Sequence, residues 1–343
     1  MSEKTRIVIF GAGSIGCHVG LTWLAAGLDI RFIGRQAVLR AASDEGACVE
    51  GDGNSHLFKP NELAFSDTPD ALADADIVAL CVKATDDAEA ASEIAAHARP
   101  GTLILSLQNG VDNAARLQTM LPDMTIIEGM VPYNVVRPTP THVRKTSAGN
   151  IIVARNAMIE AALAPLDGTA SPVEFVDDMR AVKWSKLLLN LNNPLNALSG
   201  LSLHEQLSDC AWRRLLATLQ NECLEVMSAE EIEPAKLGPL PPRLIPYFLS
   251  TPDWFFNRTG LRLQKIARDA RSSMADDFAA GRPTEIDFLN GTVAERGRRH
   301  GVPCPGNDTM VELVKQAESG GRKNWSAREI VDLINRRMAG AAS

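Results

Sequence analysis

The chain has 343 residues, of which 45% are hydrophobic, and its formal net charge is -7 at pH 7. This length and apolar content allow a full buried core and are typical of about two domains. The acidic balance leaves no extended basic surface, which argues against nucleic acids and anionic membranes as partners. An anionic ligand would therefore have to be bound by a few local cations.

The first residues run directly into a strand-like segment, and no apolar run reaches the roughly 18 to 20 residues that span a bilayer. We therefore expect no signal peptide, no membrane segment and a cytoplasmic location. The 6 cysteines include no Cys-x-x-Cys pair and have no histidine at zinc-site spacing. They are interpreted as small core residues, and no metal site is predicted.

The first half of the chain alternates short apolar runs with helical patterns, which is typical of a βαβ series. Strands are predicted at residues 5–10, 29–33, 76–82, 102–106 and 124–129, and helices at 14–27, 86–98 and 112–120. Continuous apolar strands of this kind belong to a parallel sheet covered on both faces. The pattern then changes to short β-rich pieces at 142–154 and 172–176.

After residue 177 the pattern is helical almost to the end, except for a proline-rich loop predicted from Glu233 to Pro246. The sequence thus predicts an α/β protein with an N-terminal Rossmann-type, doubly wound parallel sheet and a C-terminal all-helical domain. The domains are assigned to residues 1–178 and 179–343.

A glycine motif follows the first predicted strand at once and opens a helix; it consists of Gly11, Ala12, Gly13, Ser14, Ile15 and Gly16. In this context the pattern indicates a dinucleotide-binding loop. Gly11 would permit the tight turn, Gly13 would let a pyrophosphate approach, and Gly16 would let helix and strand pack closely. Free N–H groups of residues 13–16 would hold the phosphates. A glycine-rich turn without a ligand is the alternative.

The second predicted strand ends in Gly34 and Arg35, where an NAD enzyme usually has an acid that binds the ribose 2′-hydroxyl. A guanidinium at this position suits a 2′-phosphate instead, which makes NADPH the predicted cofactor. A solvated surface arginine is the alternative. Lys83 and Asn109 follow two later strands, at the sheet edge where ligands collect, although Asn109 with Gly110 would also form a plain turn.

Reduction of a ketone by hydride needs a proton donor at the carbonyl oxygen and, for an acid, an anchor for its carboxylate. Lys186 and Asn190 are four residues apart and therefore share one face of a predicted helix among leucines. Burial of such polar groups costs free energy, which is an argument for a functional role. The alternative, which the residues alone leave open, is a lysine that reaches to the surface and an amide that caps a neighbouring helix end.

Two helix starts are predicted from capping-box spacings, Ser273 with Asp276 and Thr284 with Asp287. Helix N-termini bind carboxylates, so Ser273 is a candidate partner for a substrate carboxylate. Glu285, in the first turn of its helix, would reach a cation or a ribose hydroxyl. Capping alone is the alternative for these residues.

Together these pieces resemble the ketopantoate reductase (2-dehydropantoate 2-reductase) family, over almost the whole chain. The matching segments are the glycine motif, Val82-Lys83-Ala84, Gln108-Asn109-Gly110, Lys186-Leu187 with Asn190, Ser272-Ser273-Met274, and Thr284 to Asp287 with Asn290-Gly291. The resemblance implies that Lys186 is the catalytic lysine and that Glu285 is the acid near it and the cofactor. It places Asn190 and Ser273 at the substrate, Lys83 and Asn109 beside the cofactor and the ketone, and Val135 at the nicotinamide half.

The resemblance implies NADPH-dependent reduction of a small 2-oxo acid, first of all ketopantoate to pantoate in pantothenate biosynthesis. Residues 1–178 would then bind NADP, and residues 179–343 would carry the catalytic and substrate groups. A homodimer is the candidate oligomeric state. One departure concerns the family's Asn-Pro pair, because Asn193 precedes Pro194 one position early at a substrate-contacting place. The alternatives are another 2-oxo acid or opine-type dehydrogenase, and a catalytically silent NADP(H)-binding regulator.

Overall fold

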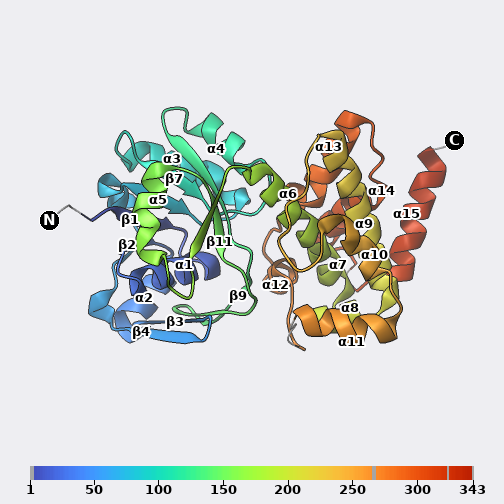
Figure 1. Ribbon diagram of the computed structural model, residues 1–343, viewed down its shortest axis with the longest axis horizontal. Helices are drawn as coiled ribbons and strands as arrows, with labels where there is room; N and C mark the ends of the chain where they lie inside the picture. The colour runs from blue at the N-terminus through green and yellow to red at the C-terminus, as the bar shows by residue number, and fades with distance from the viewer. Residues whose placement is uncertain (1–3, 265–267, 323, 342–343) are drawn as a thin grey trace. The chain divides into compact units, whose positions relative to one another are not determined.

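The computed structural model describes residues 4–264, 268–322 and 324–341 of the chain. Contacts between Cα atoms divide the chain into a first unit, Met1–Met179, and a second unit, Arg180–Ser343. Figure 1 shows that strands and helices alternate in the first unit and that the second unit is helical. Among the described residues, no helix has both the length and the apolar composition needed to cross a bilayer.

The larger sheet of the first unit has eight strands in the order β12-β11-β8-β7-β6-β1-β2-β5. The strands are β1 (Arg6–Phe10), β2 (Asp29–Ile33), β5 (Phe65–Ser66), β6 (Ile77–Leu80), β7 (Leu103–Ser106), β8 (Thr125–Met130), β11 (Ile151–Ala154) and β12 (Val173–Val176). From β5 to β8 all neighbours are parallel, in the strand order of a Rossmann fold. The strand order reverses between β1 and β6, which is where open α/β sheets bind ligands.

Helices cover both faces of this sheet because successive strand residues point to opposite sides. Ile7 and Ile9 of β1 lie in one buried cluster with residues of α1 (Ser14–Ala25) and α5 (Ala157–Leu163). Val8 lies in a second cluster with residues of α3 (Asp87–His97) and α4 (Asn113–Met120). The predicted doubly wound parallel sheet is confirmed, and its five predicted strands end within one or two residues of the expected positions.

A second sheet in the first unit was not predicted. It has four strands in the order β4-β3-β10-β9, namely β3 (Ala47–Gly51), β4 (Asn54–Phe58), β9 (Val135–Thr139) and β10 (His142–Lys145). The strands β3 and β4 form a hairpin whose turn residues, Asp52 and Gly53, have positive φ angles of 51° and 81°. The sheet packs against α1, and α2 (Gln36–Glu45) precedes it in the chain.

The second unit consists of helices. These are α6 (Met179–Asn190), α7 (Asn192–Ser199), α8 (Leu203–Ser208), α9 (Cys210–Ala229), α10 (Ile245–Leu249), α11 (Asp253–Gln264), α12 (Ser273–Ala279), α13 (Asn290–His300), α14 (Pro305–Glu318) and α15 (Ala327–Ala341). The loop predicted from Glu233 to Pro246 lies between α9 and α10, but it starts earlier, after Ala229, and its last residues are helical because a 3-10 helix covers Pro242–Leu244 and α10 begins at Ile245. Pro246 lies in the first turn of α10, where the missing N–H costs no helical hydrogen bond.

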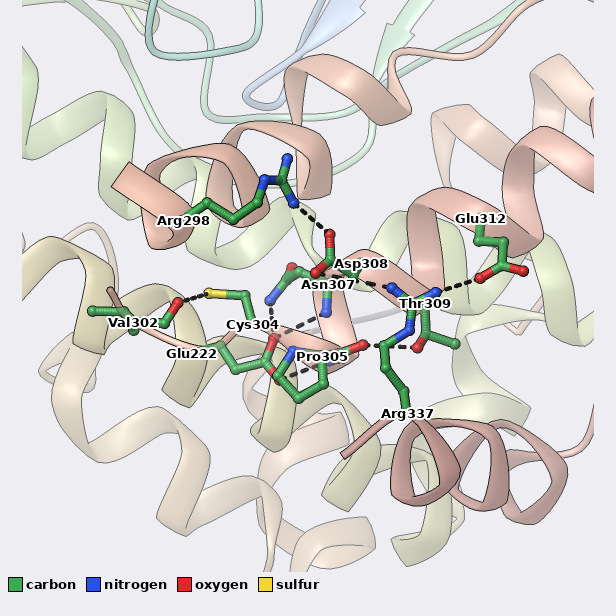
Figure 2. Close-up of polar contacts among 11 residues, drawn as sticks. Glu222, Arg298, Val302, Cys304, Pro305, Asn307, Asp308, Thr309, Glu312 and Arg337 are labelled. Atoms are coloured by element: carbon green, nitrogen blue, oxygen red, sulfur yellow. Dashed lines mark hydrogen bonds and ion pairs between the residues drawn. The ribbon is translucent and has the colours of Figure 1, made fainter. Parts of the chain in front are cut away.

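A buried carboxylate joins two helices of the second unit (Figure 2). Glu222 of α9 accepts hydrogen bonds from the backbone N–H groups of Gly306 and Asn307 at 2.7 and 2.9 Å, and from Asn307 Nδ2 at 2.7 Å. These N–H groups belong to the first turn of α14, which has no acceptors of its own there. Glu222 thus caps α14 and fixes it against α9.

Candidate active-site residues in the two units

The three glycines of the motif have three different steric environments. Gly11 has φ of 104°, and a Cβ there would lie 2.8 Å from the backbone nitrogen of Val82. A Cβ on Gly16 would lie only 2.1 Å from the carbonyl oxygen of Gly11, whereas one on Gly13 would meet no heavy atom within 4 Å. Gly11 and Gly16 are therefore required by the fold, and the open space at Gly13 is suited to a ligand.

The helix α1 begins at Ser14, and no side chain caps it. The expectation that residues 13–16 all offer free N–H groups is wrong for Gly13, because its N–H donates to the Gly11 carbonyl at 2.8 Å within the tight turn. The N–H groups of Ser14, Ile15 and Gly16 belong to the first turn, which lacks intrahelical acceptors. With the positive end of the helix dipole, these N–H groups are suited to an anion, and they lie next to the buried Ala12.

Arg35 is exposed and stands at the N-cap of α2, two residues after the end of β2. The loop that carries it is held close to the glycine motif, because a Cβ on Gly34 would come within 2.6 Å of the Ala12 Cβ. The backbone N–H groups of Gly11 and Ala12 both donate to the carbonyl oxygen of Ile33 at 3.0 Å. The guanidinium therefore extends from a loop that packs directly on the glycine loop.

Lys83 and Asn109 follow strands that end level with β1, since Phe10 is paired with Leu80 and Leu80 with Ser106. Both residues are partly buried. The amide of Gln108 donates to the Val82 carbonyl at 3.1 Å and so connects the loops after β6 and β7. The structure thus brings Lys83, Asn109 and the glycine motif to one edge of the sheet.

Val135 begins β9 and packs in part against the core of the first unit. The sequence pattern alone did not identify Arg137, which lies two residues further on the same strand face. Its Nη1 donates to the carbonyl of Ala12 in the glycine motif at 3.3 Å. The signal was present in the i, i+2 spacing from Val135, but it has meaning only once β9 is known to be a strand. Arg137 brings a further cation to the glycine loop.

In the second unit, Lys186 and Asn190 lie on α6 with the predicted four-residue spacing. Asn190 is buried and Lys186 is partly buried, between the buried Ser185 and Leu187. Desolvation lowers the pKa of Lys186 from its ordinary value of 10.5 to about 8. An ammonium with this pKa can both hold and release a proton near neutral pH.

Ser273 is not the helix cap that its spacing predicted. The cap of α12 is the preceding Ser272, whose hydroxyl accepts from the Ala275 N–H at 3.2 Å and donates to the Asn193 carbonyl at 3.2 Å. The Ser272 N–H in turn donates to the buried Asn196 side chain at 2.8 Å. This docking on α7 places Asn193 near the start of α12. It leaves Ser273 in the first turn with its side chain exposed.

Glu285 also differs from expectation, because no α-helix begins at Thr284. A short 3-10 helix, Ile286–Phe288, follows Glu285, and α13 begins only at Asn290. The Thr284 N–H donates to Glu318 at 2.7 Å, so this segment is fixed by α14 rather than by its own capping box. Glu285 is partly buried, at the start of a turn rather than within a helix.

Comparisons with known proteins cover both units. The family model described as ketopantoate reductase PanE/ApbA matches residues 7–157, and the model of its C-terminal part matches residues 178–318. A 2-dehydropantoate 2-reductase from Halobacterium salinarum is 30% identical over 92% of this chain and 100% of its own length.

Solved structures also resemble the chain, and two of them are compared with it below. A PanE/ApbA family ketopantoate reductase from Ralstonia eutropha is 27% identical, with a TM-score of 0.79 over 92% of this chain and 99% of that chain. A D-mandelate dehydrogenase, solved with NADH and anilino(oxo)acetate, is 21% identical, with a TM-score of 0.77 over 92% and 99%; this likeness concerns the fold alone. Both family models and a full-length relative agree with the resemblance seen in the sequence, and this chain is an oxidoreductase that belongs to the ketopantoate reductase family.

Proposed function

We propose that this protein reduces a 2-oxo acid to the 2-hydroxy acid with NADPH, and that its substrate is ketopantoate, the precursor of pantoate in pantothenate biosynthesis. The observation that carries the proposal is Lys186. It is a partly buried lysine whose pKa is lowered to about 8, one helical turn from a buried asparagine. The name of the Halobacterium salinarum relative supports the choice of ketopantoate.

The glycine loop supports a nicotinamide cofactor, because the space at Gly13 and the first-turn N–H groups of α1 suit a pyrophosphate. A bound reduced nicotinamide supplies the hydride. Arg35 favours NADPH over NADH, since a guanidinium binds a 2′-phosphate through charge-assisted hydrogen bonds. Arg137 adds positive charge beside Ala12, where the phosphates would lie. The family resemblance assigns Lys83 and Asn109 to places beside the cofactor and the ketone, and Val135 to the nicotinamide half.

The chemistry of the second unit rests on Lys186. Negative charge develops on the carbonyl oxygen during reduction, and the Lys186 ammonium donates a proton to it. Glu285 orients the ammonium and binds a ribose hydroxyl. Asn190 and Asn193 hydrogen-bond the substrate. The Ser273 hydroxyl, which does not cap its helix, binds the substrate carboxylate.

A second substrate class is aromatic 2-oxo acids, because the fold is shared with a D-mandelate dehydrogenase. The test is to mix the purified protein with NADPH or NADH and one substrate at a time: ketopantoate, phenylglyoxylate or pyruvate. A mixture of an amino acid and a 2-oxo acid tests the opine-type reaction. Consumption of the reduced nicotinamide is followed by its absorbance. We expect the highest kcat/KM for ketopantoate with NADPH. Preference for phenylglyoxylate would support the second class, and cofactor binding without turnover of any acid would indicate a silent regulator.

A cytoplasmic location and a homodimer stay predictions for this chain. Light scattering of the purified protein measures the second directly. A mass of one chain at micromolar concentration would contradict the homodimer.

A further inference from the structure

The second sheet of the first unit brings together a thiol, a carboxylate and an imidazole that are far apart in the sequence. Cys48 and Glu50 lie on β3 and His142 lies on β10, which is paired with β3 in parallel. The ligand atoms Sγ, carboxylate O and imidazole N all lie within 4.8 Å of one another. The spacing of 92 residues between Glu50 and His142 explains why no metal site was predicted from the sequence.

The three side chains share the sheet face that points away from α1. Val49 and Val143, which alternate with them, are buried in the core cluster that includes α1 residues. Since neighbouring strand residues point to opposite faces, Cys48, Glu50 and His142 occupy the other face. Cys48 and His142 are direct register partners. The site is therefore defined by strand pairing and not by mobile loops.

Two of the three groups are already in direct contact. His142 Nε2 lies 2.7 Å from Glu50 Oε1, and their side chains are 33% and 32% exposed. Cys48 Sγ lies 3.9 Å from the hydroxyl oxygen of Ser55 on β4. A cation bound among these three side chains would have an imidazole nitrogen, a carboxylate oxygen and a thiolate as ligands, and an open side toward solvent.

We propose that Cys48, Glu50 and His142 form a binding site for a zinc ion or another late first-row divalent metal. Thiolate and imidazole ligands select such metals over magnesium and calcium, which prefer oxygen ligands only. Three protein ligands leave a fourth, water-occupied position of a tetrahedral zinc site. Metal ligands bind in their deprotonated forms, so affinity falls in acid. Arg144, the register partner of Glu50, is exposed, and solvent screens its charge.

The consequence of occupancy is a cross-link between β3 and β10. Metal that binds the folded but not the unfolded chain raises the free energy of unfolding by an amount that grows with the logarithm of its concentration divided by its Kd. We therefore expect zinc to raise the thermal midpoint of the full-length protein. This inference does not rest on the proposed reductase activity, because none of the three residues belongs to the cofactor or substrate groups.

The test uses cobalt(II) as a spectroscopic probe, with zinc(II) as the competitor, on full-length protein freed of metal by a chelator. We expect one equivalent of cobalt to produce a thiolate-to-cobalt charge-transfer band that zinc abolishes. Cys48→Ser should remove the band, and His142→Gln should weaken cobalt and zinc binding at least about 100-fold, since even residues outside the ligand set change affinity 10- to 100-fold. Circular dichroism of each variant verifies the fold.

Two matched variants act as controls. Cys210→Ser changes a partly buried cysteine of the second unit, and His56→Gln changes an exposed histidine of β4 whose register partner is the inward-facing Val49. Both should retain the band and the zinc-dependent rise in thermal midpoint. The proposal is overturned if cobalt gives no saturable band at one equivalent. A band that persists in Cys48→Ser or disappears in Cys210→Ser would overturn it as well.

Discussion

The two units present their candidate site residues by different means. In the first unit the expected phosphate ligands are backbone N–H groups at the start of α1, and glycines supply the space around them. In the second unit the candidate groups are side chains on helices, such as Lys186 and Asn190 on α6. The first unit is therefore suited to binding, because backbone N–H groups can hold an anion but do not titrate. The second unit is suited to catalysis, because a titrating side chain can transfer a proton.

The two means also differ in what holds the groups in place. The glycine loop is positioned by contacts between neighbours in the sheet, including Gly11 against Val82. In the second unit, Ser272 holds the start of α12 against α7 through Asn193 and Asn196. Substitutions in the first unit should therefore change cofactor affinity or local packing, and substitutions in the second should change turnover or substrate affinity.

The largest expected effect is that of Lys186→Ala. General acid catalysis is typically worth about 10²- to 10⁴-fold, so kcat should fall by that factor while the Kd for NADPH changes little. Lys186→Arg is the matched control, because arginine keeps the charge and is too weak an acid to donate. Stopped-flow single turnover and fluorescence titration measure the two quantities separately. Turnover of Lys186→Ala within about threefold of the parent would remove Lys186 from the mechanism.

The pH profile of reduction sharpens the same assignment. Burial lowers the pKa of Lys186 to about 8, and only the protonated form donates. Reduction should therefore be fast below pH 8 and should decline as the pH rises through about 8. Initial rates at saturating NADPH and acid, from pH 6 to 10, measure the profile. A rate that stays level up to pH 10 would contradict a titrating lysine donor.

Arg35→Ala tests whether the first unit discriminates between cofactors by charge. Loss of a charge-assisted contact to phosphate costs about 1.5 to 3 kcal/mol, so kcat/KM for NADPH should fall about 10- to 150-fold while that for NADH stays nearly constant. Arg40→Ala, another exposed arginine on α2, is the control. Equal kcat/KM for the two cofactors in the parent enzyme would show that Arg35 has no such role.

Gly16→Ala and Gly13→Ala separate packing from ligand space within one loop. The Cβ of Gly16→Ala would overlap the Gly11 carbonyl, and such overpacking costs about 1 to 3 kcal/mol of the free energy of unfolding. The Cβ of Gly13→Ala meets open space, so stability should change by less than about 0.5 kcal/mol while NADPH affinity falls. Urea unfolding and cofactor titration distinguish the two. Equal destabilisation by both substitutions would refute the separation.

The smallest expected effects come from Ser272→Ala and Ser273→Ala. Ser272 caps α12, and loss of such a cap costs about 0.5 to 2 kcal/mol of stability. Ser273→Ala, at an exposed position, should lower the free energy of unfolding by less than about 0.5 kcal/mol. It should raise KM for the 2-oxo acid without affecting KM for NADPH. Thermal unfolding and steady-state kinetics measure both. An unchanged KM in Ser273→Ala would exclude it as the carboxylate ligand.

The glycine loop could be predicted from the sequence because its conformation depends on short-range spacing. Gly11, Gly13 and Gly16 follow a strand and open a helix, and each has the environment that this order implies. The pairing of Lys186 with Asn190 could be predicted for the same reason, since residues four apart share a helix face. The capping residue of α12 was misassigned because Ser272 and Ser273 offer the same hydroxyl, and only the contacts with Asn193 and Asn196 distinguish them.

The sequence by itself determined the alternation of strands and helices, the glycine loop and the helix that carries Lys186, because apolar periodicity and glycine positions act over a few residues. The tertiary structure alone decided the second sheet, although Asp52-Gly53 was a readable hairpin signal for half of it. It also decided the position of Arg137 beside Ala12, the lowered pKa of Lys186 and the meeting of Cys48 with His142. These features depend on strand pairing and desolvation across long stretches of chain, and local sequence patterns contain no information about which distant segments become neighbours.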